Sequence, residues 1–224
     1  MAQVLKDEVE ARIREAALDV FSARGYPGAR MAEIASRAGV STGNIYHYFR
    51  DKRTLFNGVI PDSLVREFWS VLERRLEAAS GVGTAAGLST RVSSDAGTAA
   101  SSDTPVPQSS PAPYPVAARA TVDFALQHRR ETVFLLGRAT GTPHADLADR
   151  VVARLVAAAL DHAATAGRQP SVTPALRFDL EEIYRAYVHA WVRILERFPD
   201  PGHFQEALSA YERYHLAGLR ALLE

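Results

Sequence analysis

The stretch that decides the fold is IASRAGVSTGNIYHYF, Ile34–Phe49. It predicts two short helices joined by a tight turn. Ala35 is small enough to let the helices cross closely, and Gly39, four positions on, can take the positive φ that such a turn needs. Ser41 or Thr42 can cap the second helix, because a hydroxyl accepts hydrogen bonds from the free N–H groups of a first turn. The spacing therefore predicts a helix-turn-helix.

The second helix of the motif, Thr42–Tyr48, is the one expected to meet DNA. Its outward positions should be Thr42, Gly43, Asn44, Tyr46 and His47. Asparagine can bond adenine through two hydrogen bonds, and hydroxyls and tyrosine can reach bases or phosphates. Ile45 and Tyr48 should belong to the core, and packing is the rival role for Tyr46. Beside the motif, Lys52 and either Arg50 or Arg53 are candidates to neutralise phosphates.

The composition neither favours nor opposes a nucleic-acid partner. Lys and Arg number 26 together, as do Asp and Glu, so the formal net charge is zero. DNA binding must therefore rest on the motif and on local charge. The absence of cysteine excludes disulfides, thiolate zinc sites and a cysteine nucleophile. The N-terminus does not look like a secretory signal and no apolar run could span a bilayer, so we expect a cytoplasmic protein without a membrane partner.

A long amphipathic pattern follows the motif. Large apolar side chains recur at every fourth position, at Phe56, Ile60, Leu64, Phe68, Leu72 and Leu76. This spacing predicts one face of a helix. Pro61 lies inside the pattern and should either kink the helix or restart it, because proline lacks the N–H that a helix interior uses.

The composition then changes to Gly, Ala, Ser, Thr and Pro over residues 81–115. Such a segment cannot bury enough apolar surface to offset its chain entropy. We expect residues 81–115 to form a disordered loop that is a passive insertion, with a tether that has its own role as the alternative. Helical patterns resume afterwards and no stretch alternates like a strand, so the fold should be all-α with about nine helices.

Residues in and around the motif also follow the pattern of a known family. They are Gly25-Tyr26, Ala29, Met31, Ile34-Ala35, Ala38-Gly39-Val40-Ser41, Ile45-Tyr46-His47-Tyr48-Phe49, Lys52 and Leu55-Phe56. Over roughly residues 8–56 the chain resembles the N-terminal domain of the TetR family of bacterial regulators. The resemblance implies a three-helix DNA-binding domain at residues 1–54 and a ligand-binding and dimerisation domain at residues 55–224. It also implies a homodimeric repressor that leaves a palindromic operator when a small ligand binds.

The resemblance also suggests which residues touch DNA. Carried over by position, the contacts are Ser41, Thr42, Gly43, Asn44, Tyr46, His47 and Lys52. The chain departs from the family at Ala29-Arg30, where Thr-Ser or Thr-Thr often precedes the helix. The usual hydroxyl cap and phosphate contact are therefore missing, and Arg30 is a candidate to bind a phosphate in their place.

The C-terminal region resembles no subfamily closely enough to name a ligand. By analogy with the family, the last two long helices, residues 175–198 and 203–223, should form the dimer interface. A two-fold operator needs recognition helices about 34–36 Å apart, which one monomer cannot supply. A small, largely apolar effector would bind between helices. Its candidate lining residues are Phe68, Trp69, Phe124, Phe134, Tyr184, Tyr187 and Trp191, although for any one of them an ordinary core position is the favoured role.

Other functions have less support in the sequence. The chain has no nucleophile elbow, phosphate loop or dinucleotide fingerprint, so we do not expect an enzyme. Its histidines lack the spacing of metal ligands, and no metal or cofactor is expected. The alternative to a ligand-released repressor is a regulator or activator that works without a small molecule or through a protein partner.

Overall fold

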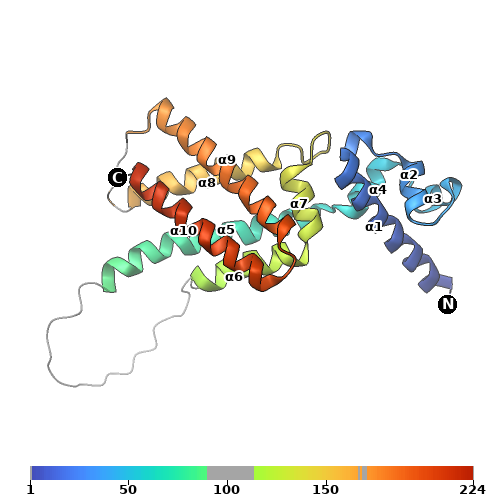
Figure 1. Ribbon diagram of the computed structural model, residues 1–224, viewed down its shortest axis with the longest axis horizontal. Helices are drawn as coiled ribbons and strands as arrows, with labels where there is room; N and C mark the ends of the chain where they lie inside the picture. Colours follow the sequence, from blue (N-terminus) through green and yellow to red (C-terminus); the bar gives the residue numbers. More distant parts are fainter. Residues whose placement is uncertain (1, 90–113, 166, 168–170, 224) are drawn as a thin grey trace, which may run out of the picture.

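The computed structural model describes residues 2–89, 114–165, 167 and 171–223, and in these residues every regular element is an α-helix. The helices are α1 (Ala2–Gly28), α2 (Met31–Arg37), α3 (Thr42–Tyr48), α4 (Lys52–Val59), α5 (Asp62–Ser89), α6 (Tyr114–Gln127), α7 (Arg129–Gly137), α8 (Leu147–Thr165), α9 (Pro174–Arg197) and α10 (Pro201–Leu223). Figure 1 shows an elongated molecule, with α1–α4 at one end and α5–α10 packed into a helical body at the other. The all-α prediction is confirmed. No helix within the described residues is long and apolar enough to cross a membrane.

The first helix bends where the sequence predicted its end. Gly25 has φ 69° and ψ 159°, outside the helical region, and the chain then makes one more turn that includes Pro27. The N–H of Ala29 donates to the carbonyl of Gly25 at 3.2 Å and closes this turn. The bend turns carbonyl groups at the end of α1 toward α4, where a lysine side chain binds them.

At Pro61 the chain takes the second of the two courses that the sequence allowed. Helix α4 ends at Val59 and α5 starts again at Asp62, so the long pattern is two helices and not one kinked helix. The last N–H of the first segment, that of Ile60, donates to Phe56 at 2.7 Å, and the carbonyl of Pro61 accepts from Leu64 at 2.9 Å. This restart is why the described residues contain ten helices where about nine were expected.

The prediction of a disordered loop over residues 81–115 is wrong at both ends of that range. Helix α5 continues to Ser89 and α6 already begins at Tyr114. No proline lies between Pro61 and Pro105, so every residue where the composition changes still has the backbone N–H that a helix needs. Helix α5 can therefore continue past that change. The rest of that prediction, residues 90–113, lies outside the described residues.

A shared core joins the two ends of the molecule. Phe21 of α1, Phe56 of α4 and Phe134 of α7 are each fully buried. Their ring centroids lie 5.9 Å apart between Phe21 and Phe56, 6.1 Å between Phe56 and Phe134, and 6.3 Å between Phe21 and Phe134. This aromatic cluster belongs to one continuous set of buried side chains that runs from α1 into α7 and α8. The domain boundary expected between residues 54 and 55 falls inside α4.

The helical body is organised around α9. It packs against α7, α8 and α10, while α5 packs along α6. Thr173 caps α9 by accepting a hydrogen bond from the N–H of Leu176 at 3.1 Å, and Pro174 occupies the first turn, where its missing N–H has no cost. Leu180 and Leu195 of α9 and Phe204 of α10 are fully buried, so the body has its own apolar interior.

Candidate nucleic-acid interface

Helices α2 and α3 meet in the geometry that the sequence predicted. Gly39, in the turn between them, has φ +68°, and an added Cβ there would meet nothing within 4 Å. The backbone conformation, rather than lack of space, is therefore what requires glycine. The N–H of Val40 donates to the carbonyl of Ala35 at 3.0 Å and closes the turn. The helix-turn-helix is confirmed.

Helix α3 is fixed at its start and along its inner face. The hydroxyl of Ser41 accepts a hydrogen bond from the N–H of Asn44 at 3.1 Å, as a helix cap does. Ile45 is fully buried, and Ala35 and Ile34 of α2 are buried as well. An apolar inner face and a capped first turn together set how the outer face of α3 is presented to solvent.

The outer face of α3 consists of the residues that the sequence selected. Thr42, Gly43, Asn44 and His47 are exposed, and the side chain of Tyr46 is 50% exposed. An added Cβ at Gly43 would also meet nothing within 4 Å, so the protein itself does not need a glycine there. A hydroxyl, an amide, a phenol and an imidazole thus stand on one short helix beside a position with no side chain. These groups can hydrogen-bond base edges and phosphates.

The structure gives Lys52 a role that the sequence did not predict. Its ammonium donates to the carbonyl oxygens of Tyr26 at 2.8 Å, Ala29 at 3.1 Å and Pro27 at 3.3 Å. It also lies 4.7 Å from the centre of the Tyr26 ring. All three N–H donors of the ammonium face the end of α1, where carbonyl groups lack helical partners. Lys52 therefore joins α4 to α1, and its predicted contact with DNA stays a prediction.

The side chains of two arginines near the motif have no hydrogen-bond or ion-pair partner among the described residues. Arg30 lies at the start of α2 and makes no capping hydrogen bond, as expected for a residue that replaces a hydroxyl. Arg53, next to Lys52, is also exposed. Arg50, in contrast, pairs with Asp51 at 3.2 Å. The pKa of Asp51 is lowered, mainly because its carboxylate accepts the backbone N–H of Thr54 at the start of α4.

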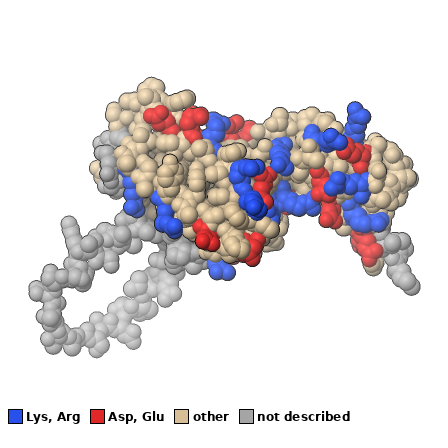
Figure 2. Space-filling model, in the orientation of Figure 1, with Lys and Arg blue, Asp and Glu red and all other residues tan. Residues whose placement is uncertain are grey.

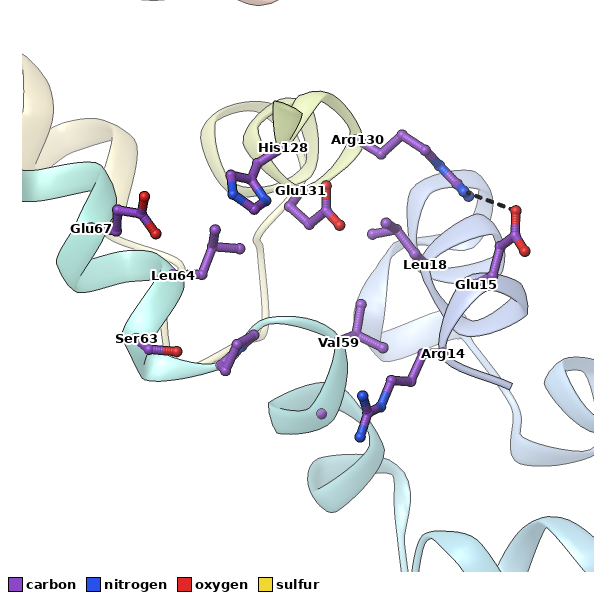
Figure 3. A pocket seen from close by; sticks show the side chains of 12 residues that line it. Arg14, Glu15, Leu18, Val59, Ser63, Leu64, Glu67, His128, Arg130 and Glu131 are labelled. Atoms are coloured by element: carbon purple, nitrogen blue, oxygen red, sulfur yellow. Dashed lines mark ion pairs between the residues drawn. The ribbon is translucent and has the colours of Figure 1, made fainter. Parts of the chain in front are cut away.

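A hollow of about 520 Å³ lies where the N-terminal helices meet the body. Figure 3 shows that α1 supplies Arg14, Glu15 and Leu18 to it. On the α7 side, His128 points toward Leu64 of α5 and Glu131 points toward Leu18. Arg130 pairs with Glu15 across its rim at 3.7 Å. The hollow is lined by both ends of the molecule, and none of the seven aromatic candidates for an effector pocket lines it.

Those seven candidates lie instead in or against the apolar cores. Phe124 is buried against Phe68 of α5, with ring centroids 6.2 Å apart, and Phe134 is buried in the aromatic cluster with Phe21 and Phe56. Phe68 and Trp69 pack against the same core. Trp191 is buried against Phe204, with ring centroids 5.5 Å apart. Tyr184 and Tyr187 belong to the α8–α9–α10 core. Burial raises the pKa of Tyr184 to about 12, so its phenol stays protonated. Their role as pocket residues stays a prediction.

The described residues hold no group of three His, Asp or Glu side chains placed to bind a metal ion.

The sequence did not predict a set of ion-paired arginines that lies between α1, α2 and α7. Arg37, at the end of α2, pairs with Asp19 of α1 at 2.9 Å, and Arg130 of α7 pairs with the same carboxylate. The partners lie far apart in the chain, so no local pattern could have indicated them.

Comparisons with known proteins agree with the N-terminal geometry. A family described as bacterial regulatory proteins, tetR family, matches residues 13–59, which run from α1 to the end of α4. The HTH-type transcriptional regulator BetI of Burkholderia mallei (strain NCTC 10229) is 39% identical over 70 residues, 31% of this chain and 35% of that protein. BetI of Burkholderia cenocepacia (strain HI2424) is 39% identical over 69 residues, with the same coverage.

These similarities are confined to part of each protein. The chain spans about a third of the length of the curated relatives that it matches, at 35% of their residues. Among solved structures, a tetR family transcription regulator from Shewanella sp. PV-4 overlaps with a TM-score of 0.36 and 18% identity, over 91% of this chain and 95% of that one. A TM-score this low does not establish a shared fold for the body.

Proposed function

We propose that residues 13–59, which match the tetR family of bacterial regulatory proteins, form a DNA-binding domain. We propose further that the chain is a sequence-specific transcriptional regulator that acts on DNA in the cytoplasm. The observation that carries the proposal is the outer face of α3. Thr42, Asn44, Tyr46 and His47 are exposed on a helix whose inner face is buried and whose start is capped. Side chains on so short a rigid helix can reach base edges in the major groove.

We propose that the protein works as a homodimer through α9 and α10. One face of α10 is exposed and carries small residues beside one aromatic ring: Ala210, Tyr214, Ala217, Gly218 and Ala221. Tyr214 is 75% exposed, and an added Cβ at Gly218 would meet nothing within 4 Å. Small residues along one face let a second helix approach closely. A two-fold operator supports the same assignment, because it requires two recognition helices about 34–36 Å apart.

We further propose that the regulator is a repressor that a small, largely apolar ligand releases from its operator. Helices α1, α4, α5 and α7 meet around a shared aromatic cluster, so a change in the body reaches the helices that hold α3. A ligand that binds one dimer geometry more tightly shifts the population toward it and changes the distance between the two recognition helices. The seven aromatic candidates in the body are the residues that we propose to line the ligand site.

DNA binding is tested by titrating the upstream intergenic DNA with the full chain and measuring fluorescence anisotropy. The variant Asn44→Ala should weaken specific binding by about tenfold, because a good contact to a base edge contributes about 1–3 kcal/mol. Its exposed side chain makes no hydrogen bond or ion pair among the described residues, so stability should not change. Gln205→Ala, which removes an exposed amide from α10, is the matched control. Absence of any sequence-specific complex at moderate salt would refute the proposal.

Dimerisation is tested by sedimentation of Tyr214→Asp. A carboxylate in the proposed interface would be desolvated without a partner, so the variant should sediment as a monomer and lose operator affinity. Gln205→Asp places the same charge on the opposite side of α10 and should remain dimeric. A dimer that tolerates Tyr214→Asp as well as the control would exclude this face.

A further inference from the structure

A second hollow, of about 410 Å³, lies between α1, the end of α2, α7 and α9. Its charged side chains are Arg37, Arg129, Arg130, Arg138, Asp19 and Glu196. We call it the arginine hollow. Four guanidinium groups and two carboxylates line it, so its local charge is positive although the whole chain is formally neutral. In Figure 2, Lys and Arg atoms lie beside Asp and Glu atoms where the two ends of the molecule join.

The two carboxylates are already shared among the arginines. Asp19 accepts from Arg37 at 2.9 Å through one oxygen and from Arg130 through the other. Glu196 accepts from Arg138 at 2.7 Å, and its second oxygen pairs with Arg193 at 3.1 Å. Neither acid can neutralise its neighbours fully, because each serves two cations. The excess of positive charge is therefore a property of the site and not of one side chain.

Apart from the pair of Arg130 with Glu15 at 3.7 Å, the remaining bonds of these arginines go to uncharged groups. Arg129 donates to the backbone carbonyl of Glu196 at 2.6 Å, and Arg138 donates to the carbonyl of Ser22 at 3.3 Å. A guanidinium has five N–H donors, and each of these arginines uses only one or two of them. The backbone bonds orient the guanidinium planes without using their charge. Donors in a fixed orientation are suited to a ligand that accepts several bonds at once.

We propose that the arginine hollow binds a small multivalent anion, such as a phosphate ester or a di- or tricarboxylate. Such a ligand supplies the two negative charges that the lining lacks, and its paired oxygens match the forked donors of arginine. The hollow is large enough for it, since small-molecule sites occupy about 300–1,000 Å³. A single monovalent ion would leave part of the excess charge unpaired.

The position of the hollow gives this binding a consequence for regulation. Arg37 belongs to α2, next to the turn of the helix-turn-helix, whereas Arg130 and Arg138 lie on α7 and at its end. An anion held by both groups binds only when α2 and α7 stand as they do here, so it selects this arrangement. This consequence rests on the proposed function, but anion binding itself does not.

The experiment is calorimetric titration of the DNA-free full chain with inorganic pyrophosphate and, separately, with citrate, at constant ionic strength set with chloride. We expect saturable binding with a Kd of about 1 mM or tighter. Arg37→Gln and Arg138→Gln should each weaken anion binding by about tenfold. Arg138→Lys should weaken it less, because lysine keeps the positive charge but lacks the paired donors of the guanidinium. Arg185→Gln is the control, since that arginine pairs with Asp149 at 2.7 Å outside the hollow.

Circular dichroism and urea unfolding of each variant establish that it is folded before its titration is compared. Absence of saturable heat up to about 10 mM of either anion would overturn the proposal. Equal binding by the chain with intact arginines and by the two glutamine variants would also overturn it.

A third outcome also overturns the proposal: no anion binds, and each glutamine variant lowers the salt slope of DNA affinity by about 0.9. The arginines would then neutralise DNA phosphates. Because the titrations contain no DNA, failure of the anion site leaves the proposed regulator untouched.

Discussion

Replacing Lys52 by methionine separates a structural role of this cation from a role at the DNA. Methionine keeps the length and apolar stem of lysine but removes the ammonium that bonds Tyr26, Pro27 and Ala29. A hydrogen-bonded charged group contributes about 1.5–3 kcal/mol net, and a cation over an aromatic ring at a partly exposed site adds about 0.5–1 kcal/mol. We therefore expect Lys52→Met to lower the free energy of unfolding by about 2–4 kcal/mol.

Urea unfolding and thermal melting measure this change at one fixed protein concentration. For a chain of this length the loss corresponds to a fall in Tm of about 4–16 °C. Arg53→Met is the matched control, because it removes the neighbouring cation from the same turn of α4, where that residue is exposed and has no bonding partner among the described residues. If Lys52→Met unfolds like the control while the salt slope of DNA binding falls by about 0.9, the ammonium serves the phosphate backbone and the structural assignment is wrong.

Two further predictions concern stability. Gly141→Ala should destabilise the chain by about 2–4 kcal/mol, because Gly141 has φ +79° and a new Cβ would lie 2.6 Å from the rigid ring of Pro27. Gly167→Ala, at φ +74° with nothing within 4 Å, should cost only the backbone strain, and equal losses in urea unfolding would mean that the contact is irrelevant. His215 is buried beside Tyr187 at 4.3 Å between ring centroids, and burial lowers its pKa from 6.5 against the opposing charge of Glu212. The unfolded chain therefore takes up this proton first, so stability should be constant above about pH 6.5 and fall as the pH drops below it, a slope that His215→Phe should remove.

The parts of the fold that the sequence predicted are those with local causes. The helix-turn-helix depends on Ala35, Gly39 and Ser41, which lie within seven positions of one another, and each acts through its own backbone or its own helix turn. The same holds for the bend at Gly25 and the break at Pro61. Residue type and spacing fix such features before any tertiary contact forms.

The parts that the sequence did not predict depend on the meeting of distant segments. Asp19 and Arg130 pair although 111 positions separate them, so neither the arginine hollow nor its charge could be derived from spacing. The sequence predicts a DNA contact for Lys52, but it does not predict the bonds of its ammonium, because these depend on where the bend of α1 leaves carbonyl groups without helical partners. The predicted end of the α5 pattern lies too early in the chain, because a change in composition without a proline does not by itself end a helix.

The aromatic cluster of Phe21, Phe56 and Phe134 bears on how such proteins can be recombined. If residues 1–59 were replaced by the corresponding segment of another regulator, Phe134 would face a surface that was not shaped for it. The hybrid would keep every residue of a transplanted recognition helix and still pack poorly at the joint. An exchange of DNA specificity in this chain is thus better made at the outer positions of α3 alone, where the replaced side chains are exposed.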